Sequence, residues 1–184
     1  SHKKILIFTV GRSDYGILRN LIMEFDKFKG IDSKLIILGN HFEKKFGYTY
    51  SEIKNDGIKK KLNIKIPYEK KLINKTNFYI SKILLNLEKN IINKDVSAII
   101  LGDRYEAFAI SIFCLTHNIP IIHFGGGSVT LGAHDENYRN FISKISQIHF
   151  VETIDHKKNL IKNNIIPSKI FITGAPSLEN IKKI

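Results

Sequence analysis

Short runs of β-branched residues alternate along the chain with segments of helical length, and this alternation restricts the possible folds more than any other feature. Seven runs are predicted to be strands: Lys4–Val10, Lys34–Leu38, Asn63–Ile66, Ser97–Leu101, Pro120–Phe124, Gln147–Val151 and Lys169–Ile172. Runs such as Ile5–Phe8 and Ala98–Leu101 are continuously apolar, which is typical of strands with helices on both faces. The sequence therefore predicts an α/β fold with a doubly wound, mostly parallel sheet of about seven strands.

The clearest helical segment is Asn77–Ile92. Ile80, Leu84, Leu87 and Ile91 recur in it at intervals of three to four residues. We expect this apolar stripe to face the sheet.

Length and composition limit the class of protein. At 184 residues the chain suits a single domain, 1–184. No apolar run of membrane-spanning length and no signal-peptide pattern is visible, so we expect a cytoplasmic protein with no membrane partner. The net charge of +12 raises the question of nucleic acid. However, the lysines are scattered and no nucleic-acid-binding signature is present, so we expect no nucleic-acid partner and a solvated basic surface.

The chain has one cysteine, Cys114, in the apolar stretch Ile110–Leu115. A single cysteine excludes an internal disulfide and a cysteine cage for a metal ion. We expect a buried, inert thiol, no bound metal and no cofactor.

Polar motifs follow three of the predicted strands, where parallel sheets bind their ligands. The first is Gly11-Arg12-Ser13-Asp14-Tyr15-Gly16. Glycine allows a tight turn, a helix N-terminus offers free N–H groups, and Arg12 can clamp a phosphate or carboxylate. Alternatively, Ser13 or Asp14 caps the helix and Arg12 lies on the surface. The motif is not a dinucleotide fingerprint, because the Gly-x-Gly-x-x-Gly spacing is missing.

The second motif is Gly102-Asp103-Arg104-Tyr105-Glu106. An aspartate at this place can transfer a proton or bind a sugar hydroxyl, or it can simply cap the next helix beside an Arg–Glu pair.

The third motif runs from His123 through Gly125-Gly126-Gly127 to Asp135-Glu136. Consecutive glycines are costly to order, so they indicate either backbone that approaches a ligand closely or a flexible loop. His123 is either a ligand-contacting or a core histidine, and the two acids can satisfy a helix dipole.

With these motifs the chain resembles the hydrolysing UDP-N-acetylglucosamine 2-epimerases of sialic and legionaminic acid synthesis. The resemblance runs from end to end and also includes Gly39–Phe42, Phe46–Thr49, Asp56-Gly57, Arg139, Ser143–Ser146 and Gly174–Pro176. It implies two Rossmann-like domains of the glycosyltransferase-B type, of which this chain is the first, with the second, nucleotide-binding domain absent. It further implies a UDP-sugar substrate, loss of the C2 proton, expulsion of UDP to give a glycal, and addition of water. The resemblance also implies a homodimer through helices of this first domain, for which the exposed apolar residues of Asn77–Ile92 offer a surface.

The resemblance also assigns roles to matching positions. The predicted catalytic residues are Asp103, Asp135 and Glu136. The predicted substrate-binding residues are Arg12, Ser13, Asp14, Tyr15, Arg104, Glu106, His123, Gly126, Gly127, Thr130 and Arg139. Within this set Arg12 serves the diphosphate, His123 and the glycines position the sugar, and Glu136 and Arg139 also orient the loop.

One departure bears on mechanism. The family usually carries a catalytic glutamate in the glycine-rich stretch, where this chain has Gly125 and Ser128. Either another carboxylate such as Glu136 substitutes, or the substrate differs, or the homologue does not catalyse the reaction. A glycosyltransferase of the same architecture and a non-catalytic sugar-nucleotide-binding domain therefore stay as alternatives.

Overall fold

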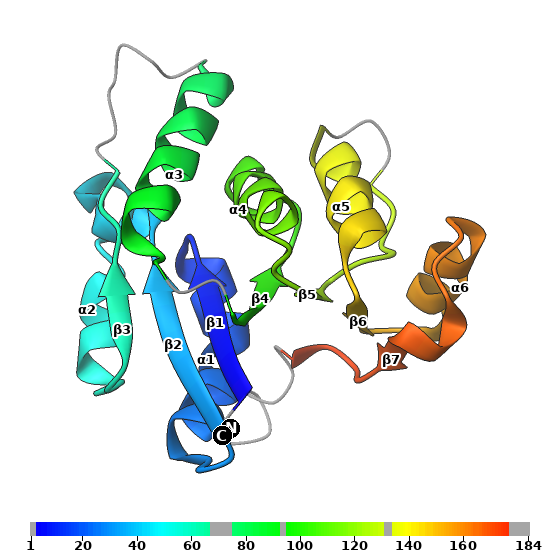
Figure 1. The fold of residues 1–184 in the computed structure, drawn as a ribbon, viewed down its shortest axis with the longest axis horizontal. Helices are drawn as coiled ribbons and strands as arrows, with labels where there is room; N and C mark the ends of the chain where they lie inside the picture. The colour runs from blue at the N-terminus through cyan, green and yellow to red at the C-terminus, as the bar shows by residue number, and fades with distance from the viewer. Residues whose placement is uncertain (1–2, 67–74, 93–94, 131–133, 177–184) are drawn as a thin grey trace.

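All seven predicted strands lie in one sheet of the computed structural model, which describes residues 3–66, 75–92, 95–130 and 134–176 (Figure 1). The strands are β1 (Lys3–Thr9), β2 (Ile31–Ile37), β3 (Lys61–Asn63), β4 (Ser97–Leu101), β5 (Ile121–Phe124), β6 (Ile148–Val151) and β7 (Ile170–Ile172). Their order is β3-β2-β1-β4-β5-β6-β7, and every neighbouring pair is parallel. The prediction of a parallel sheet is confirmed.

Helices cover the two faces of the sheet unequally (Figure 1). One face packs against α1 (Arg12–Lys27) and α2 (Tyr50–Asn55) through an apolar cluster that includes Ile7, Leu18, Ile37 and Ile53. The other face packs against α3 (Thr76–Asn90), α4 (Tyr105–Thr116), α5 (His134–Ile145) and α6 (Ile154–Lys162). Short 3-10 turns lie at Gly39–Phe42, Lys44–Phe46 and Pro167–Lys169. The doubly wound arrangement is thus also confirmed.

Two strand boundaries differ from the prediction. β2 begins at Ile31, three residues earlier than expected, because Ile31, Asp32 and Ser33 continue the parallel pairing with β1. β3 ends at Asn63, where the predicted strand Asn63–Ile66 begins. Ile64 and Ile66 are buried in the core, but their burial comes from packing beyond the end of the strand pairing.

The predicted apolar stripe of α3 is confirmed at Leu87 and Ile91 and is displaced by one residue in the first half of the helix. Tyr79, Ile83, Leu87 and Ile91 are buried, whereas Ile80 and Leu84 lie at the edge of the core and are partly buried. Tyrosine was not counted as an apolar position, and its ring supplies the first contact of the stripe. Leu85 on the same helix is 57% exposed, and the homodimer stays a prediction.

The single thiol is placed as expected. Cys114 is buried in α4 and burial raises its pKa to about 12, so the thiol is protonated and inert at neutral pH. No helix in the described part of the chain has the length and apolar character needed to cross a membrane.

Candidate nucleotide-sugar site at the carboxyl edge of the sheet

The direction in which successive strands are added to the sheet reverses between β1 and β4. From β1 the chain continues outward through β2 and β3, and it then returns to build β4 to β7 on the other side of β1. The helices that follow β1 and β4 pack on opposite faces, which leaves a crevice at the carboxyl ends of these two strands. A pocket of about 430 Å³ lies there and is lined by Gly11, Arg12, Ser13, Asn40, Thr49 and Arg104.

Two arginines give this pocket a positive charge. The Arg12 side chain is 75% exposed, and its Nε lies 3.4 Å from Oε1 of Glu52. Arg104 donates two hydrogen bonds, of 3.1 and 3.2 Å, to the buried carboxylate of Glu106. Burial disfavours the charged guanidinium of Arg104, but the Glu106 carboxylate more than offsets this and raises the pKa. Arg104 is therefore held in a fixed orientation, whereas Arg12 is exposed and can exchange its surface ion pair with Glu52 for an anion from solvent.

The turn into α1 is fixed by Asp14. Its Oδ2 accepts a hydrogen bond of 2.9 Å from the backbone N–H of Val10, and its Oδ1 accepts one of 3.1 Å from the Ser13 hydroxyl. Burial raises the pKa of this carboxyl group. The residue preceding α1 is Gly11, and no described side chain caps it, which contradicts the alternative of a Ser13 or Asp14 cap. The first N–H groups of α1 thus face the pocket without a side-chain acceptor.

Tyr15 does not lie in the pocket, although it was predicted to contact substrate. It is 2% exposed within the core between α1 and the sheet, and its hydroxyl donates a 2.5 Å hydrogen bond to Oδ2 of Asp56. Arg19 donates two more hydrogen bonds, of 2.5 and 2.7 Å, to the same carboxylate and lowers its pKa. The apolar spacing within α1 turns Tyr15 inward, so its role is to fix helix α1.

A second polar cluster joins the end of β4 to α5. Arg139 is almost fully buried and pairs with the Asp103 carboxylate. It also donates to the backbone oxygen of Ser128, at 2.8 Å, and to the hydroxyl of Thr130, at 3.3 Å. Oε2 of Glu136 accepts a 3.2 Å hydrogen bond from the N–H of Thr130. Arg139 and Glu136 therefore hold the loop after β5 against Asp103.

His123 belongs to the core, which corrects the prediction that it positions the sugar. It is fully buried; its Nε2 donates to the backbone oxygen of Gly102 at 2.9 Å, and its Nδ1 accepts from the Ser143 hydroxyl at 3.1 Å. Burial lowers its pKa to about 4, so the ring is neutral. Both ring nitrogens form hydrogen bonds inside the protein, and His123 thus holds the carboxyl end of β4 in place.

The glycines after His123 approach protein rather than ligand. A Cβ at Gly126 would lie 2.8 Å from Oγ of Ser143, and one at Gly127 would lie 2.2 Å from the backbone oxygen of His156. Asn159 of α6 donates a 2.9 Å hydrogen bond to the Gly127 oxygen. Glycine is required here because the loop packs directly on α5 and α6. The sequence suggested only a loop that approaches a ligand or a flexible loop, and not close packing on helices.

The profile of the family described as UDP-N-acetylglucosamine 2-epimerase matches residues 23–184. The chain belongs to this family. It is 32% identical over 185 residues to the GDP/UDP-N,N'-diacetylbacillosamine 2-epimerase (hydrolyzing) of Campylobacter jejuni, covering all of this chain and 48% of that one. It is 33% identical over 186 residues to the polysialic acid biosynthesis protein P7 of Escherichia coli, covering 97% of this chain and 46% of that one.

A solved structure of the same epimerase family shares the fold. The UDP-GlcNAc 2-epimerase of Neisseria meningitidis, bound to UDP-GlcNAc, superimposes with a TM-score of 0.80 at 26% identity. The match covers 97% of this chain and 50% of that chain. The chain therefore spans about half the length of the relatives it matches and corresponds to one half of that solved structure.

The predicted epimerase residues fall into three groups. The first group lines one pocket and consists of Arg12, Ser13 and Arg104. The second group forms the cluster beside that pocket and consists of Asp103, Thr130, Glu136 and Arg139. The third group supports both from within the protein and consists of Asp14, Tyr15, Glu106, His123, Gly126 and Gly127. Asp135 is exposed on the first turn of α5, one turn before Arg139. Arg12, Asp103 and Asp135 thus lie along one edge of the sheet, but Asp103 and Asp135 do not line the pocket that holds Arg12.

Site prediction missed Asn40 and Thr49, which line the pocket with Arg12. Beneath them His41 is fully buried between the hydroxyls of Thr9, at 2.9 Å, and Thr49, at 2.8 Å. A polar Gly-Asn-His motif directly after a buried strand was the available signal, because β2 ends at the same edge as β1.

Three buried histidines predict loss of stability in mild acid. Burial lowers the pKa of His41 and of His123 to about 4, below the usual value of 6.5, and it also lowers the pKa of His149. Between these values the unfolded chain binds protons that the folded chain does not, so stability falls as the pH falls. We expect a loss of about 1 kcal/mol per histidine between about pH 6.5 and pH 5.5.

Urea unfolding at the two pH values measures this loss. The His41→Gln variant should lose about 1 kcal/mol of this pH dependence, whereas His134→Gln, at an exposed position, should retain all of it. Equal stability of the parent protein at both pH values would contradict the prediction.

Proposed function

We propose that the protein is the first half of a hydrolysing 2-epimerase that acts on UDP-N-acetylglucosamine or a 2,4-diacetamido relative and releases UDP and the free 2-epimeric sugar. The proposal rests on one observation: in a chain of this epimerase family, Arg12 and Arg104 line one pocket at the carboxyl edge of the sheet, beside the Asp103–Arg139 pair. The names of the Campylobacter and Legionella relatives, both hydrolysing diacetylbacillosamine 2-epimerases, support the hydrolysing type and a diacetamido sugar.

In the proposed reaction the diphosphate binds at the entrance to α1. Arg12 and the free N–H groups of the helix stabilise its negative charge, which grows as the bond from C1 to the UDP oxygen breaks. Arg104, held by Glu106, extends the positive wall of the pocket. These contacts make UDP a better leaving group.

Proton transfer at C2 falls to the carboxylates of the second cluster. Asp103 and Asp135 are the candidates for taking the C2 proton and for guiding water to the glycal, and Arg139 orients Asp103. The candidate positions of the usual family glutamate hold Gly125 and Ser128, and the backbone oxygen of Ser128 is bound by Arg139. Glu136 lies on the first turn of α5 and already contacts Thr130 of the loop, so it is the carboxylate best placed to substitute.

The complete protein should be supplied with UDP-N-acetylglucosamine and with its 2,4-diacetamido analogues, and the release of UDP and free sugar should be followed. We expect equal amounts of UDP and 2-epimeric sugar from at least one of them. Sugar transferred to an acceptor instead of water would favour a glycosyltransferase, and binding without release would favour a non-catalytic domain.

Two substitutions separate binding from support in this site. Arg12→Gln should weaken UDP binding about tenfold and leave stability unchanged, because Arg12 is 75% exposed. Tyr15→Phe should lower the free energy of unfolding by about 1 kcal/mol and leave UDP binding unchanged, because it removes only the hydrogen bond to Asp56. Calorimetric titration with UDP measures the binding affinity, and urea unfolding measures the stability. Weaker UDP binding in Tyr15→Phe would contradict the assignment of Tyr15 to a supporting role.

A further inference from the structure

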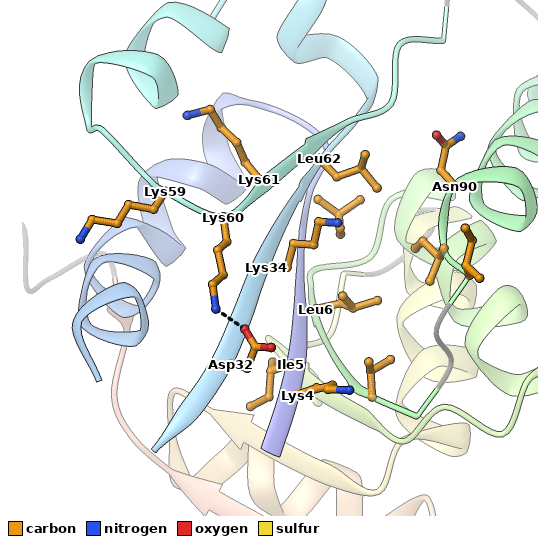
Figure 2. A pocket seen from close by; sticks show the side chains of 14 residues that line it. Lys4, Ile5, Leu6, Asp32, Lys34, Lys59, Lys60, Lys61, Leu62 and Asn90 are labelled. Carbon is orange, nitrogen blue, oxygen red and sulfur yellow. Dashed lines mark hydrogen bonds and ion pairs between the residues drawn. The ribbon is translucent and has the colours of Figure 1, made fainter. Parts of the chain in front are cut away.

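A second pocket, of about 470 Å³, lies at the amino ends of β1, β2 and β3, at the opposite edge of the sheet from the candidate epimerase site (Figure 2). It opens beside the last turn of α3. Its apolar lining includes Leu6, Ile36, Leu62 and Ile91, all of which belong to or pack against the core on the α3 face. The pocket is therefore separate from the crevice between β1 and β4.

Lysines dominate the charge of this pocket. Lys4, Lys34, Lys59, Lys60 and Lys61 line it, and Asp32 is the acidic residue among the described lining residues. Nζ of Lys60 lies 2.5 Å from Oδ1 of Asp32, so this pair is mutually neutralised. The sequence suggested scattered, solvated lysines, but parallel pairing of the three strands brings these five together.

Three of the five ammonium groups, those of Lys4, Lys34 and Lys59, stay uncompensated. In the part of the chain that the structure describes, none of them forms an ion pair or a side-chain hydrogen bond, whereas Lys61 donates to the backbone oxygen of Ile58 at 2.8 Å. Lys59 extends away from the pocket, so Lys4 and Lys34 are the two that matter for a ligand (Figure 2). Both extend toward the side of the pocket where Asn90 lies (Figure 2). Two like charges over an apolar floor repel each other, and an anion placed between them removes that repulsion.

We propose that this pocket binds a small organic anion with an apolar body. Its acid group pairs with Lys4 and Lys34, and its body lies on Leu6 and Leu62. An inorganic anion would leave the apolar side chains of the pocket exposed to water, and a neutral apolar molecule would leave the two lysines unpaired. The site therefore prefers a ligand that has both an acid group and an apolar body.

Phenyl phosphate is a suitable probe, with inorganic phosphate and benzyl alcohol as its two halves. Binding to the 184-residue chain is followed by NMR of the methyl groups of Leu6, Ile36, Leu62 and Ile91. We expect phenyl phosphate to shift these methyl signals and to bind about tenfold more tightly than either half. The double variant Lys4→Gln/Lys34→Gln should bind it about tenfold more weakly.

The matched control is Lys158→Gln/Lys162→Gln, which removes the same charge from exposed positions on α6. It should change the affinity less than about twofold. An equal loss in both double variants would show only a general charge effect and overturn the proposal. Unmoved pocket methyl signals, or inorganic phosphate binding as tightly as phenyl phosphate, would overturn it as well.

Discussion

Replacing Gly127 with alanine is expected to lower the free energy of unfolding by about 3 kcal/mol. Gly127 has a φ of +81°, a conformation that costs a residue with a side chain about 1–2 kcal/mol. The added Cβ would also lie 2.2 Å from the backbone oxygen of His156, so α6 would have to move away from the loop. Both penalties act on the packing of the loop that Arg139 holds against Asp103.

Two glycines serve as matched controls for this substitution. Gly125→Ala has a φ of +86° but its nearest contact is 3.8 Å away, so it should show only the backbone penalty of about 1 kcal/mol. Gly11→Ala has a φ of −164° and nothing within 4 Å, so its stability should change by less than about 0.5 kcal/mol. The shift of the urea midpoint measures all three. If Gly127→Ala is no less stable than Gly125→Ala, close approach to α6 is not the reason for glycine at this position.

Replacing Asp103 with asparagine is expected to slow UDP release in the complete protein by about 10²- to 10⁴-fold. Asparagine has the same shape and can still accept a hydrogen bond from Arg139, so the loop after β5 should keep its position. What it loses is the negative charge and the ability to take a proton. UDP affinity should therefore stay within about threefold of the parent, since Asp103 does not line the pocket with Arg12 and Arg104.

Asp155→Asn on α6 is the control, because Asp155 is exposed and pairs only with Lys158 in the described part of the chain. It should leave the rate unchanged. Unchanged UDP release in Asp103→Asn would contradict a catalytic role for Asp103 and move that role to Asp135 or Glu136, to be tested by Asp135→Asn and Glu136→Gln.

Local patterns in the chain were sufficient for the strands and for the edge that carries the site. Five of the seven strands differ from prediction by no more than one residue at either end, because a continuous apolar run such as Ser97–Leu101 is buried on both faces. The errors fell at β2 and β3, whose residues Asp32, Ser33 and Lys61 are polar and lie at the open amino edge of the sheet.

The roles of the site residues were less predictable than their positions. Arg12, Asp103 and Arg104 were found from their place after strands. Tyr15 and His123 were assigned to the ligand, but their partners Asp56 and Ser143 lie 41 and 20 residues away in sequence. A polar residue after a strand has the same local pattern whether it faces the ligand or a buried partner. Burial depends on which distant segment packs beside it.

The sequence by itself determined the kind and order of the elements, the parallel sheet and the edge that carries the candidate site, since these follow from short-range periodicity and from the geometry of parallel strands. Only the tertiary structure decided that β4 lies beside β1, that Arg139 reaches Asp103 across 36 residues, and that five lysines meet at the opposite edge. These features depend on which distant segments pack together, and that choice is set by the burial of the whole core rather than by any local pattern.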